Sequence, residues 1–379
     1  MSLRIPFYKP EIDKTALFSM WNEAIDNGWL TTGPLTRKLE QKLAEFLRCE
    51  EIVCVSSATA GLQIALRLLG LKPGSRVALS VNTFVSAFEV ILNENLIPVL
   101  IDIDGESLNM NLNQLEKFSA NELACVMAVP FAGMPLPMKQ LQEICLKNNW
   151  PLILDNAHAL EATYQNKPVQ SFCDMAVYSF YATKNLTSAE GGAIYCKDPQ
   201  MAARARTMAL HGLSRESWQR YSGGGWRYDV AEFGFKANLT DIHSAIALAQ
   251  VDSLKDKMER RKILWSLYCE NLRDIPEIKF QSCNDKFIES ARHLFIIQVS
   301  SKERDHVVRC LNENGIGTSL HFIPLHLFSA IRSNFAWKEG DFPVVEQYFA
   351  GCLSLPFYPQ LLESELKEIT SIIRNAVVG

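Results

Sequence analysis

Short apolar runs alternate with amphipathic segments between residues 52 and 196, and this alternation limits the fold more than any other feature of the sequence. The runs with the length and composition of buried strands are 52–55, 76–79, 97–101, 123–129, 151–154, 175–181 and 192–196. Between them, apolar residues recur at helical spacing, as in Leu62, Ala65, Leu66 and Leu69. The alternation predicts an α/β fold in which helices cover both faces of a mainly parallel sheet. Ligands of such sheets bind beyond the carboxyl ends of the strands.

A second, smaller unit is expected after the alternating region. The charged stretch 255–262 predicts an exposed hinge, and an apolar run at 294–299 is followed by a helical pattern around 307–311. At 379 residues the chain is long enough for two cores. We therefore predict a large domain of residues 1–250, with an N-terminal arm, and a smaller C-terminal α+β domain of residues 251–379.

Composition narrows the class of protein. Apolar residues make up 48% of the chain and charged residues 21%, as in ordinary globular proteins. The net charge of −4, without a basic cluster, argues against nucleic acid as a partner. No run is long enough to span a membrane, and the start of the chain lacks the apolar stretch of a signal peptide. Because the ten cysteines form no C-x-x-C pair, we expect free thiols in a reducing cytoplasm and no metal site.

Three groups with chemical potential fall at or just beyond expected strand ends. They are the turn Ser56-Ser-Ala-Thr-Ala-Gly61, the residue Asp155 and the residue Lys184. The turn opens a helix, so its backbone N–H groups and hydroxyls can hold an anion. A lysine at the mouth of a sheet can lose its charge and attack a carbonyl, although Lys184 could also be a lysine that extends to solvent.

One cofactor, pyridoxal 5′-phosphate, uses all three groups, because its ring carries an aldehyde, a phosphate and a cationic nitrogen. Lys184 would form a Schiff base with the aldehyde and later carry the substrate proton, and Asp155 would pair with the ring nitrogen. The remaining predicted contacts are with the phosphate (Ala58, Thr59, Ser179), the ring face (Phe84) and the phenolic oxygen (His158). No dinucleotide or P-loop motif competes for the site.

Each residue also has an ordinary structural explanation. The Ser56–Thr59 cluster and Asn238 could be helix caps, and Asp155 could cap a helix or pair with an arginine. Phe84 could belong to the core, and His158 could be a hydrogen-bonded structural histidine. All of these explanations would have to hold at once, so we favour the joint interpretation.

Several motifs together resemble the DegT/DnrJ/EryC1/StrS family of sugar aminotransferases, over nearly the whole chain. They are Gly28-Trp-Leu-Thr-Thr-Gly-Pro34, the 56–61 turn, Asp155-Asn-Ala-His158, residues 179–192, His211-Gly212, Gly234-Phe-Lys-Ala-Asn-Leu-Thr-Asp241 and Gly315-Ile-Gly-Thr-Ser-Leu-His321. The resemblance implies the type I fold of pyridoxal-phosphate transferases, as in aspartate aminotransferase. Within the family, the motifs look most similar to those of enzymes that make UDP-4-amino-4-deoxy-L-arabinose.

The resemblance also implies an activity and an assembly. Family members move an amino group, usually from glutamate, to a nucleotide-linked 4-keto sugar, in amino-sugar and surface polysaccharide biosynthesis such as that of lipopolysaccharide. They are homodimers with shared sites, so Asn238 is expected to reach the partner's cofactor phosphate and residues 218–229 to lie near the partner's pocket. Arg227, Lys236 and His321 are candidates for the diphosphate or hydroxyls of the substrate, or else surface charges and a core histidine.

Two departures from the family pattern leave the sugar open. Asn156 stands where a small residue is usual in the family, and Phe322-Ile-Pro-Leu-His326 differs in a segment that we expect to influence sugar specificity. Two other functions are compatible with such a fold. A dehydratase of the same family carries a histidine in place of the lysine, so Lys184 argues against that lyase. A non-catalytic binding protein would be expected to have lost Lys184 or Asp155.

Overall fold

The computed structural model describes residues 3–213 and 229–378. Its main sheet has seven strands in the order β1-β9-β8-β5-β4-β2-β3. These strands are β1 (Val53–Val55), β2 (Arg76–Ser80), β3 (Ile97–Ile101), β4 (Cys125–Ala128), β5 (Leu152–Asp155), β8 (Met175–Ser179) and β9 (Gly192–Cys196). Strands β3, β2, β4, β5 and β8 pair in parallel, whereas β9 runs antiparallel to both of its neighbours, β8 and β1. The predicted α/β class with a mainly parallel sheet is confirmed.

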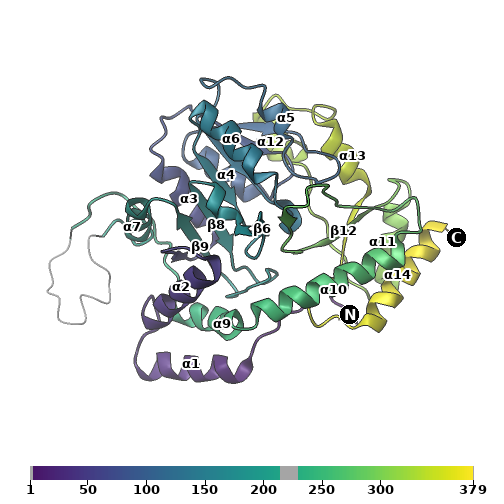
Figure 1. The fold of residues 1–379 in the computed structure, drawn as a ribbon, viewed down its shortest axis with the longest axis horizontal. Helices are drawn as coiled ribbons and strands as arrows, with labels where there is room; N and C mark the ends of the chain where they lie inside the picture. Colours follow the sequence, from purple (N-terminus) through teal and green to yellow (C-terminus); the bar gives the residue numbers. More distant parts are fainter. Residues whose placement is uncertain (1–2, 214–228, 379) are drawn as a thin grey trace.

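The period of two along the strands divides the interior into two cores. In β4, Val126 and Ala128 belong to a core with α2, α6 and α9, whereas Cys125 and Met127 belong to a core with α3, α4 and α7. Helices therefore cover both faces of the sheet (Figure 1). The helices of this region are α1 (Lys14–Asp26), α2 (Pro34–Leu47), α3 (Ala58–Leu68), α4 (Val85–Asn93), α5 (Leu112–Leu115), α6 (Met138–Asn148), α7 (Pro199–Met208) and α9 (Asp241–Val251), with 3₁₀ turns η1 (Phe131–Gly133) and η2 (Val169–Phe172).

A side chain of α9 caps the start of α2. The Asp241 carboxylate is fully buried and accepts hydrogen bonds from the backbone N–H groups of Gly33 at 2.8 Å and Thr36 at 2.9 Å. It also accepts from the Thr36 hydroxyl at 2.6 Å. Since the first turn of a helix leaves its N–H groups without partners, this carboxylate fixes the entry to α2 and the loop before it.

The C-terminal part forms a third core around a small antiparallel sheet. This sheet has the order β10-β12-β13, and the core packs α10, α11 and α14 against it, together with Ile5 from the N-terminal segment. A third sheet, β11-β6-β7, joins the two parts of the chain. The bounds are β6 (Thr163–Tyr164), β7 (Lys167–Pro168), β10 (Lys279–Phe280), β11 (Ile288–Glu289), β12 (Phe295–Gln298), β13 (Cys352–Leu355), α10 (Leu254–Leu272), α11 (Arg304–Glu313), η3 (Leu325–Leu327), α12 (Ser329–Asn334), α13 (Pro343–Gly351) and α14 (Glu363–Val378).

The charged stretch 255–262 is part of one long helix. Helix α10 extends from α9 towards α14 along the lower edge of the view in Figure 1. Lys257 and Arg261 are buried on it, so the predicted exposure of the stretch is wrong at these two positions. The Lys257 ammonium donates to the Glu11 carbonyl at 2.7 Å, and the Arg261 guanidinium donates to the carbonyls of residues 292, 293 and 357.

Three findings bear on the broad class of the protein. Among the helices in residues 3–213 and 229–378, none is long and apolar enough to cross a membrane. Within the same residues, no three His, Cys, Asp or Glu side chains are grouped to hold a metal ion. All ten cysteines are free thiols.

Candidate active site

A cleft of about 450 Å³ opens beyond the carboxyl ends of β2, β5 and β8. Its volume lies in the range of small-molecule sites. The cleft is lined by Ser57, Ala58, Thr59, Leu62, Thr83, Phe84, Ser86, Val129, Asp155, Ala157, His158, Ser179, Tyr181, Thr183, Lys184, Glu190, Gly191, His321 and Phe322. Eight of the sequence-predicted residues thus meet here: Ala58, Thr59, Phe84, Asp155, His158, Ser179, Lys184 and His321.

Lys184 follows β8 in a tight turn. Its backbone N–H donates to the Tyr181 carbonyl at 2.9 Å, and its own carbonyl accepts from the Tyr8 hydroxyl at 3.0 Å. Burial lowers the pKa of the Lys184 amine to about 8, and the attraction of Asp155 offsets part of this effect. About a tenth of the amine is therefore unprotonated at pH 7, and this form can act as a nucleophile or base.

Asp155 ends β5 with its carboxylate almost fully buried, at 5% exposure. Burial raises the pKa of this carboxyl, while the Ala157 N–H, which donates to it at 3.1 Å, and the charge of Lys184 act in the opposite direction. A buried carboxylate of this kind gains most from a cationic group in the cleft, because such a group compensates its lost hydration.

The first turn of α3 provides an anion cradle. Ser57 caps the helix, because its hydroxyl accepts from the Ala60 N–H at 3.1 Å. The N–H groups of Ala58 and Thr59, at the start of the helix, have no partner inside the helix. A Cβ atom on Gly192 would lie 2.7 Å from the Ala58 nitrogen, so only glycine lets β9 pass this close to the turn. Ala58, Thr59 and Ser179 line the cleft beside this positive end of the helix.

His158 is held as a neutral ring. Its Nδ1 atom accepts from the Ala132 N–H at 3.2 Å, which leaves Nε2 as the nitrogen that carries the proton. Burial lowers the pKa of His158 well below its ordinary value, and the charge of Lys184 adds to this effect. The ring stacks on Phe322, with centroids 5.9 Å apart, and contacts His293 at 4.5 Å. His158 can therefore donate a hydrogen bond to an oxygen in the cleft.

His321 comes from the C-terminal part of the chain, and its ring centroid lies 6.4 Å from that of His158. Its Nδ1 atom is 2.9 Å from the Ser354 hydroxyl, and its ring stacks on Phe7. Burial and the Lys184 charge lower the pKa of His321 to about 3. A neutral ring suits a ligand hydroxyl better than a diphosphate.

Phe84 caps α4 and is 57% exposed, with its ring 5.9 Å from Phe322. The explanation of Phe84 as a core residue is therefore wrong. A half-exposed ring at the rim of a cleft is available to stack on a flat ligand.

Several residues at or behind the cleft have no marker in the sequence. Thr83 lines it at 1% exposure, and its hydroxyl has no hydrogen-bond partner among the described residues. Behind Lys184, the Asn185 side chain donates to the buried Glu161 carboxylate at 3.0 Å and lies 3.1 Å from His293 Nδ1. Phe322, from a segment that departs from the family pattern, forms part of the wall. Of the residues behind Lys184, only Glu161 stands out in the sequence, as an acidic residue between the apolar residues Leu160 and Ala162.

Other predicted residues lie elsewhere. Asn156 is buried behind Asp155, and neither it nor Lys236 or Asn238 is among the described residues that line the cleft. His326 is buried and pairs with Glu346 at 2.8 Å. Arg227 and most of the loop 218–229 lie outside the described residues.

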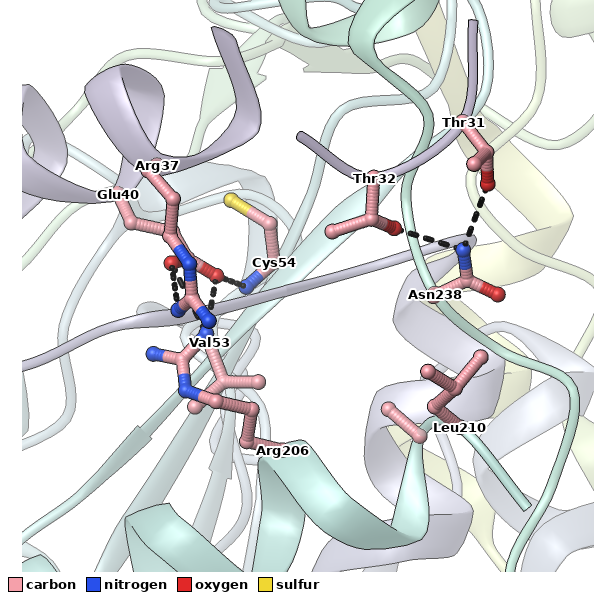
Figure 2. A pocket seen from close by; sticks show the side chains of 10 residues that line it. Thr31, Thr32, Arg37, Glu40, Val53, Cys54, Arg206, Leu210 and Asn238 are labelled. Atoms are coloured by element: carbon pink, nitrogen blue, oxygen red, sulfur yellow. Dashed lines mark hydrogen bonds and ion pairs between the residues drawn. The ribbon is translucent and has the colours of Figure 1, made fainter. Parts of the chain in front are cut away.

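Asn238 lines a second, small pocket, shown in Figure 2. Its amide donates to the hydroxyls of Thr32 at 2.7 Å and Thr31 at 3.3 Å, and its oxygen accepts from the Lys236 ammonium. On the other side of the pocket, Glu40 pairs with the guanidinium groups of Arg37 and Arg206. The side chain of Asn238 thus lines this pocket and is not among the described residues that line the cleft.

Comparisons with known proteins agree with this geometry. A family model described as the DegT/DnrJ/EryC1/StrS aminotransferase family matches residues 11–374. The chain is 33% identical to the spore coat polysaccharide biosynthesis protein SpsC of Bacillus subtilis, over 99% of this chain and 97% of SpsC. The structure is similar to the protein Spr1654 of Streptococcus pneumoniae, described as a sugar aminotransferase and solved with pyridoxamine phosphate. The TM-score is 0.92 at 28% identity, and the match covers 99% of each chain.

A third similarity is to the aminotransferase TlmJ of Streptoalloteichus hindustanus. The TM-score is 0.90 at 26% identity, over 100% of this chain and 99% of TlmJ. These similarities confirm the predicted type I fold of pyridoxal-phosphate transferases.

Proposed function

Because the chain belongs to the DegT/DnrJ/EryC1/StrS aminotransferase family, we propose that it moves an amino group from glutamate to a nucleotide-linked 4-keto sugar. Aminotransferases of this family use pyridoxal 5′-phosphate. The observation that carries the proposal is the meeting, in one cleft, of a lysine with a lowered pKa, a buried carboxylate and an open helix N-terminus.

The cleft residues fit this cofactor. The first turn of α3 and Ser179 would bind the phosphate, Phe84 would stack on the ring, and the His158 Nε2–H would donate to the phenolic oxygen. Asp155 would hold a proton on the ring nitrogen. The positive charge of that nitrogen would compensate the lost hydration of the buried carboxylate. When bound, the cofactor supplies a reactive aldehyde and a ring that accepts electrons from the substrate carbon. Lys184 would take the proton from that carbon and return it, since its amine is partly unprotonated near neutral pH.

The polar lining of the cleft supports a sugar as the amino acceptor. Thr59, Thr83, Ser86 and Thr183 bring hydroxyls to a wall that also contains the aromatic ring of Phe322. Such a mixture matches a sugar, which has hydroxyls at its edge and apolar C–H faces. The names of SpsC and Spr1654 point in the same direction.

We place the active unit in a homodimer with shared sites. Asn238 lines a pocket other than its own cleft, and Lys236 beside it would supply a positive charge for a phosphate group of the partner's site. Large apolar side chains are exposed on α1, with Phe18 at 54% and Ile25 at 60%, and in the segment after residue 229, with Phe233 at 87%. Exposed apolar residues of this size are typical of an interface. We further propose a cytoplasmic reaction that serves amino-sugar or surface polysaccharide biosynthesis, including lipopolysaccharide.

An absorption spectrum of the purified chain, before and after addition of glutamate, tests the proposal. A visible cofactor band that shifts on glutamate, with borohydride fixing the cofactor on Lys184, would establish the first half-reaction. A panel of UDP-, GDP- and dTDP-linked 4-keto sugars would then identify the acceptor. Loss of sugar hydroxyl without amine transfer would favour a dehydratase. A chain that stays colourless with added cofactor would favour a non-catalytic binding protein.

A further inference from the structure

The N-terminal segment 3–8, which we call the strap, connects the C-terminal part of the chain to the turn of Lys184. At one end, the Ile5 N–H donates to the Gly315 carbonyl at 3.1 Å, and the Gly317 N–H donates to the Ile5 carbonyl at 2.8 Å. Arg4 adds an ion pair with Glu368 on α14. The Ile5 side chain is fully buried in the third core. The strap is therefore anchored on the C-terminal part.

The anchor depends on a glycine. A Cβ atom on Gly317 would lie 2.8 Å from the Phe7 nitrogen and 2.8 Å from the Leu3 Cδ1 atom. Any side chain at this position would push the strap away from the segment that it pairs with. Gly317 is not among the described residues that line the cleft. A substitution at Gly317 can therefore displace the strap without changing a cleft residue.

At its other end, the strap reaches the active cleft through two consecutive aromatic residues. The Phe7 ring stacks on His321, with centroids 5.7 Å apart and an angle of 28° between the planes. The Tyr8 hydroxyl donates to the Lys184 carbonyl at 3.0 Å. The Lys184 N–H donates to the Tyr181 carbonyl. Both backbone groups of Lys184, its N–H and its carbonyl, are therefore hydrogen-bonded.

We propose that Tyr8 is a positioning residue for Lys184, which holds the lysine turn closed against water through its hydroxyl bond to the Lys184 carbonyl. The inference rests on the proposed function of Lys184 as the amine of the reaction. It adds that the strap, anchored at Ile5 and Gly317, keeps this amine desolvated.

The surroundings of the two groups support this role. Burial raises the pKa of Tyr8 to about 12, so its hydroxyl keeps the proton that it donates. The neighbouring Arg261 guanidinium opposes that rise. Among the described residues, Asp155 is the charged group that acts on the Lys184 pKa, and Glu190 also lines the cleft. His158, His293 and His321 have lowered pKa values and stay neutral. Dehydration is the main cause that lowers the Lys184 pKa, so water entering an opened turn would raise it.

Competitive labelling of the whole 379-residue chain measures the pKa of the Lys184 amine. The chain is freed of cofactor and labelled with trace acetic anhydride from pH 6 to 11, and mass spectrometry quantifies the Lys184 peptide. For the wild type, we expect a midpoint near pH 8. In Tyr8→Phe, the midpoint should rise by about half a unit or more. Gly317→Ala should raise it in the same direction. In the cofactor-loaded enzyme, both variants should lower kcat about tenfold with little change in KM.

Two control variants separate positioning from general loosening. Tyr358→Phe removes a hydroxyl from a residue of the third core, and this hydroxyl makes no hydrogen bond to the described residues. Gly105→Ala adds a methyl group that would meet only Val344, at 3.5 Å. Both should keep the wild-type midpoint.

The outcomes distinguish this inference from the proposed function. An unchanged midpoint in Tyr8→Phe would overturn the positioning role, as would an equal shift in Tyr358→Phe. The labelling uses no substrate, so a failure to find an amino-acceptor sugar would count against the proposed function alone.

Discussion

Asp155 and Lys184 attract each other in one buried cleft, and burial drives both groups towards their neutral forms. The pKa of the Asp155 carboxyl is raised, and that of the Lys184 amine is lowered to about 8. The carboxylate ends β5, and the lysine follows the adjacent parallel strand β8, with Asp155 in register with Val177. The sheet thus fixes the relative positions of the two groups before any ligand binds.

Replacing Lys184 by alanine should abolish turnover and the visible band of the tethered cofactor. The reason is that no other amine lines the cleft among the described residues. Absorbance spectra and amine-transfer assays would measure both effects. Lys197→Ala, which changes a lysine just past the end of β9, is the matched control and should leave both unchanged. Turnover at the wild-type rate without Lys184 would refute the mechanism.

Asp155→Asn should leave the cofactor bound but slow proton abstraction about 10²–10³-fold. A neutral amide cannot hold the proton on the ring nitrogen, so charge that develops on the substrate carbon loses its stabilisation. Single-turnover kinetics with glutamate would measure the step, and equilibrium dialysis would measure cofactor retention. A normal single-turnover rate would contradict the role given to Asp155.

The rate of cofactor capture by the cofactor-free chain should rise with pH around a midpoint near 8. Only the unprotonated amine attacks the aldehyde, and its fraction grows from about 9% at pH 7 to about 91% at pH 9. Stopped-flow absorbance would therefore show roughly a tenfold increase between these values. A midpoint near the ordinary lysine value of 10.5 would mean that the amine is not desolvated.

Acid should destabilise the fold through His321. Its folded pKa of about 3 lies below the ordinary value of 6.5, so the unfolded chain takes up the proton first as the pH falls. The unfolded chain then binds more protons, and stability is lost from pH 6.5 downwards. Between pH 7 and 5 the loss from this group is about 2 kcal/mol. Urea unfolding should show that loss reduced in His321→Gln and unchanged in the exposed control His306→Gln. Equal losses in the two variants would contradict the prediction.

Mixed dimers test whether sites are shared. Asn238→Ala alone should weaken cofactor retention, because the partner's phosphate loses a donor. A dimer of one Lys184→Ala chain and one Asn238→Ala chain would contain one site in which both residues are intact. Such heterodimers, purified through two different tags, should recover roughly half of the wild-type activity. No recovery in proven heterodimers would exclude sharing through Asn238.

The sequence predicts the sheet well where local patterns decide its structure. Parallel strands with apolar runs and intervening helices were expected, and their carboxyl ends bring Asp155 and Lys184 together as predicted. The antiparallel insertion of β9 between β8 and β1 was not expected, because pairing direction is set by tertiary contacts that leave no periodic mark.

Buried charges explain the error in α10. Lys257 and Arg261 share the buried stripe of Leu254, Leu264 and Tyr268. Their spacing matches that stripe, but charged side chains usually indicate an exposed face, and the sequence carries no sign of their buried partners. The groups they meet, the Glu11 carbonyl and the carbonyls of residues 292, 293 and 357, are far away in sequence. We retain the division into residues 1–250 and 251–379 as a proposal, supported by the third core.

The pairing of Ile5 with residues 315–317 has a consequence for the order of synthesis. The strap is synthesised before the main sheet, whereas the segment it pairs with, and the neighbouring His321, follow only after the whole sheet. Domains form as their residues emerge, so the sheet and its lysine turn can fold while the strap still has no partner. If the strap holds the lysine turn as proposed, the nascent chain presents an open, hydrated lysine until residues 315–317 have emerged.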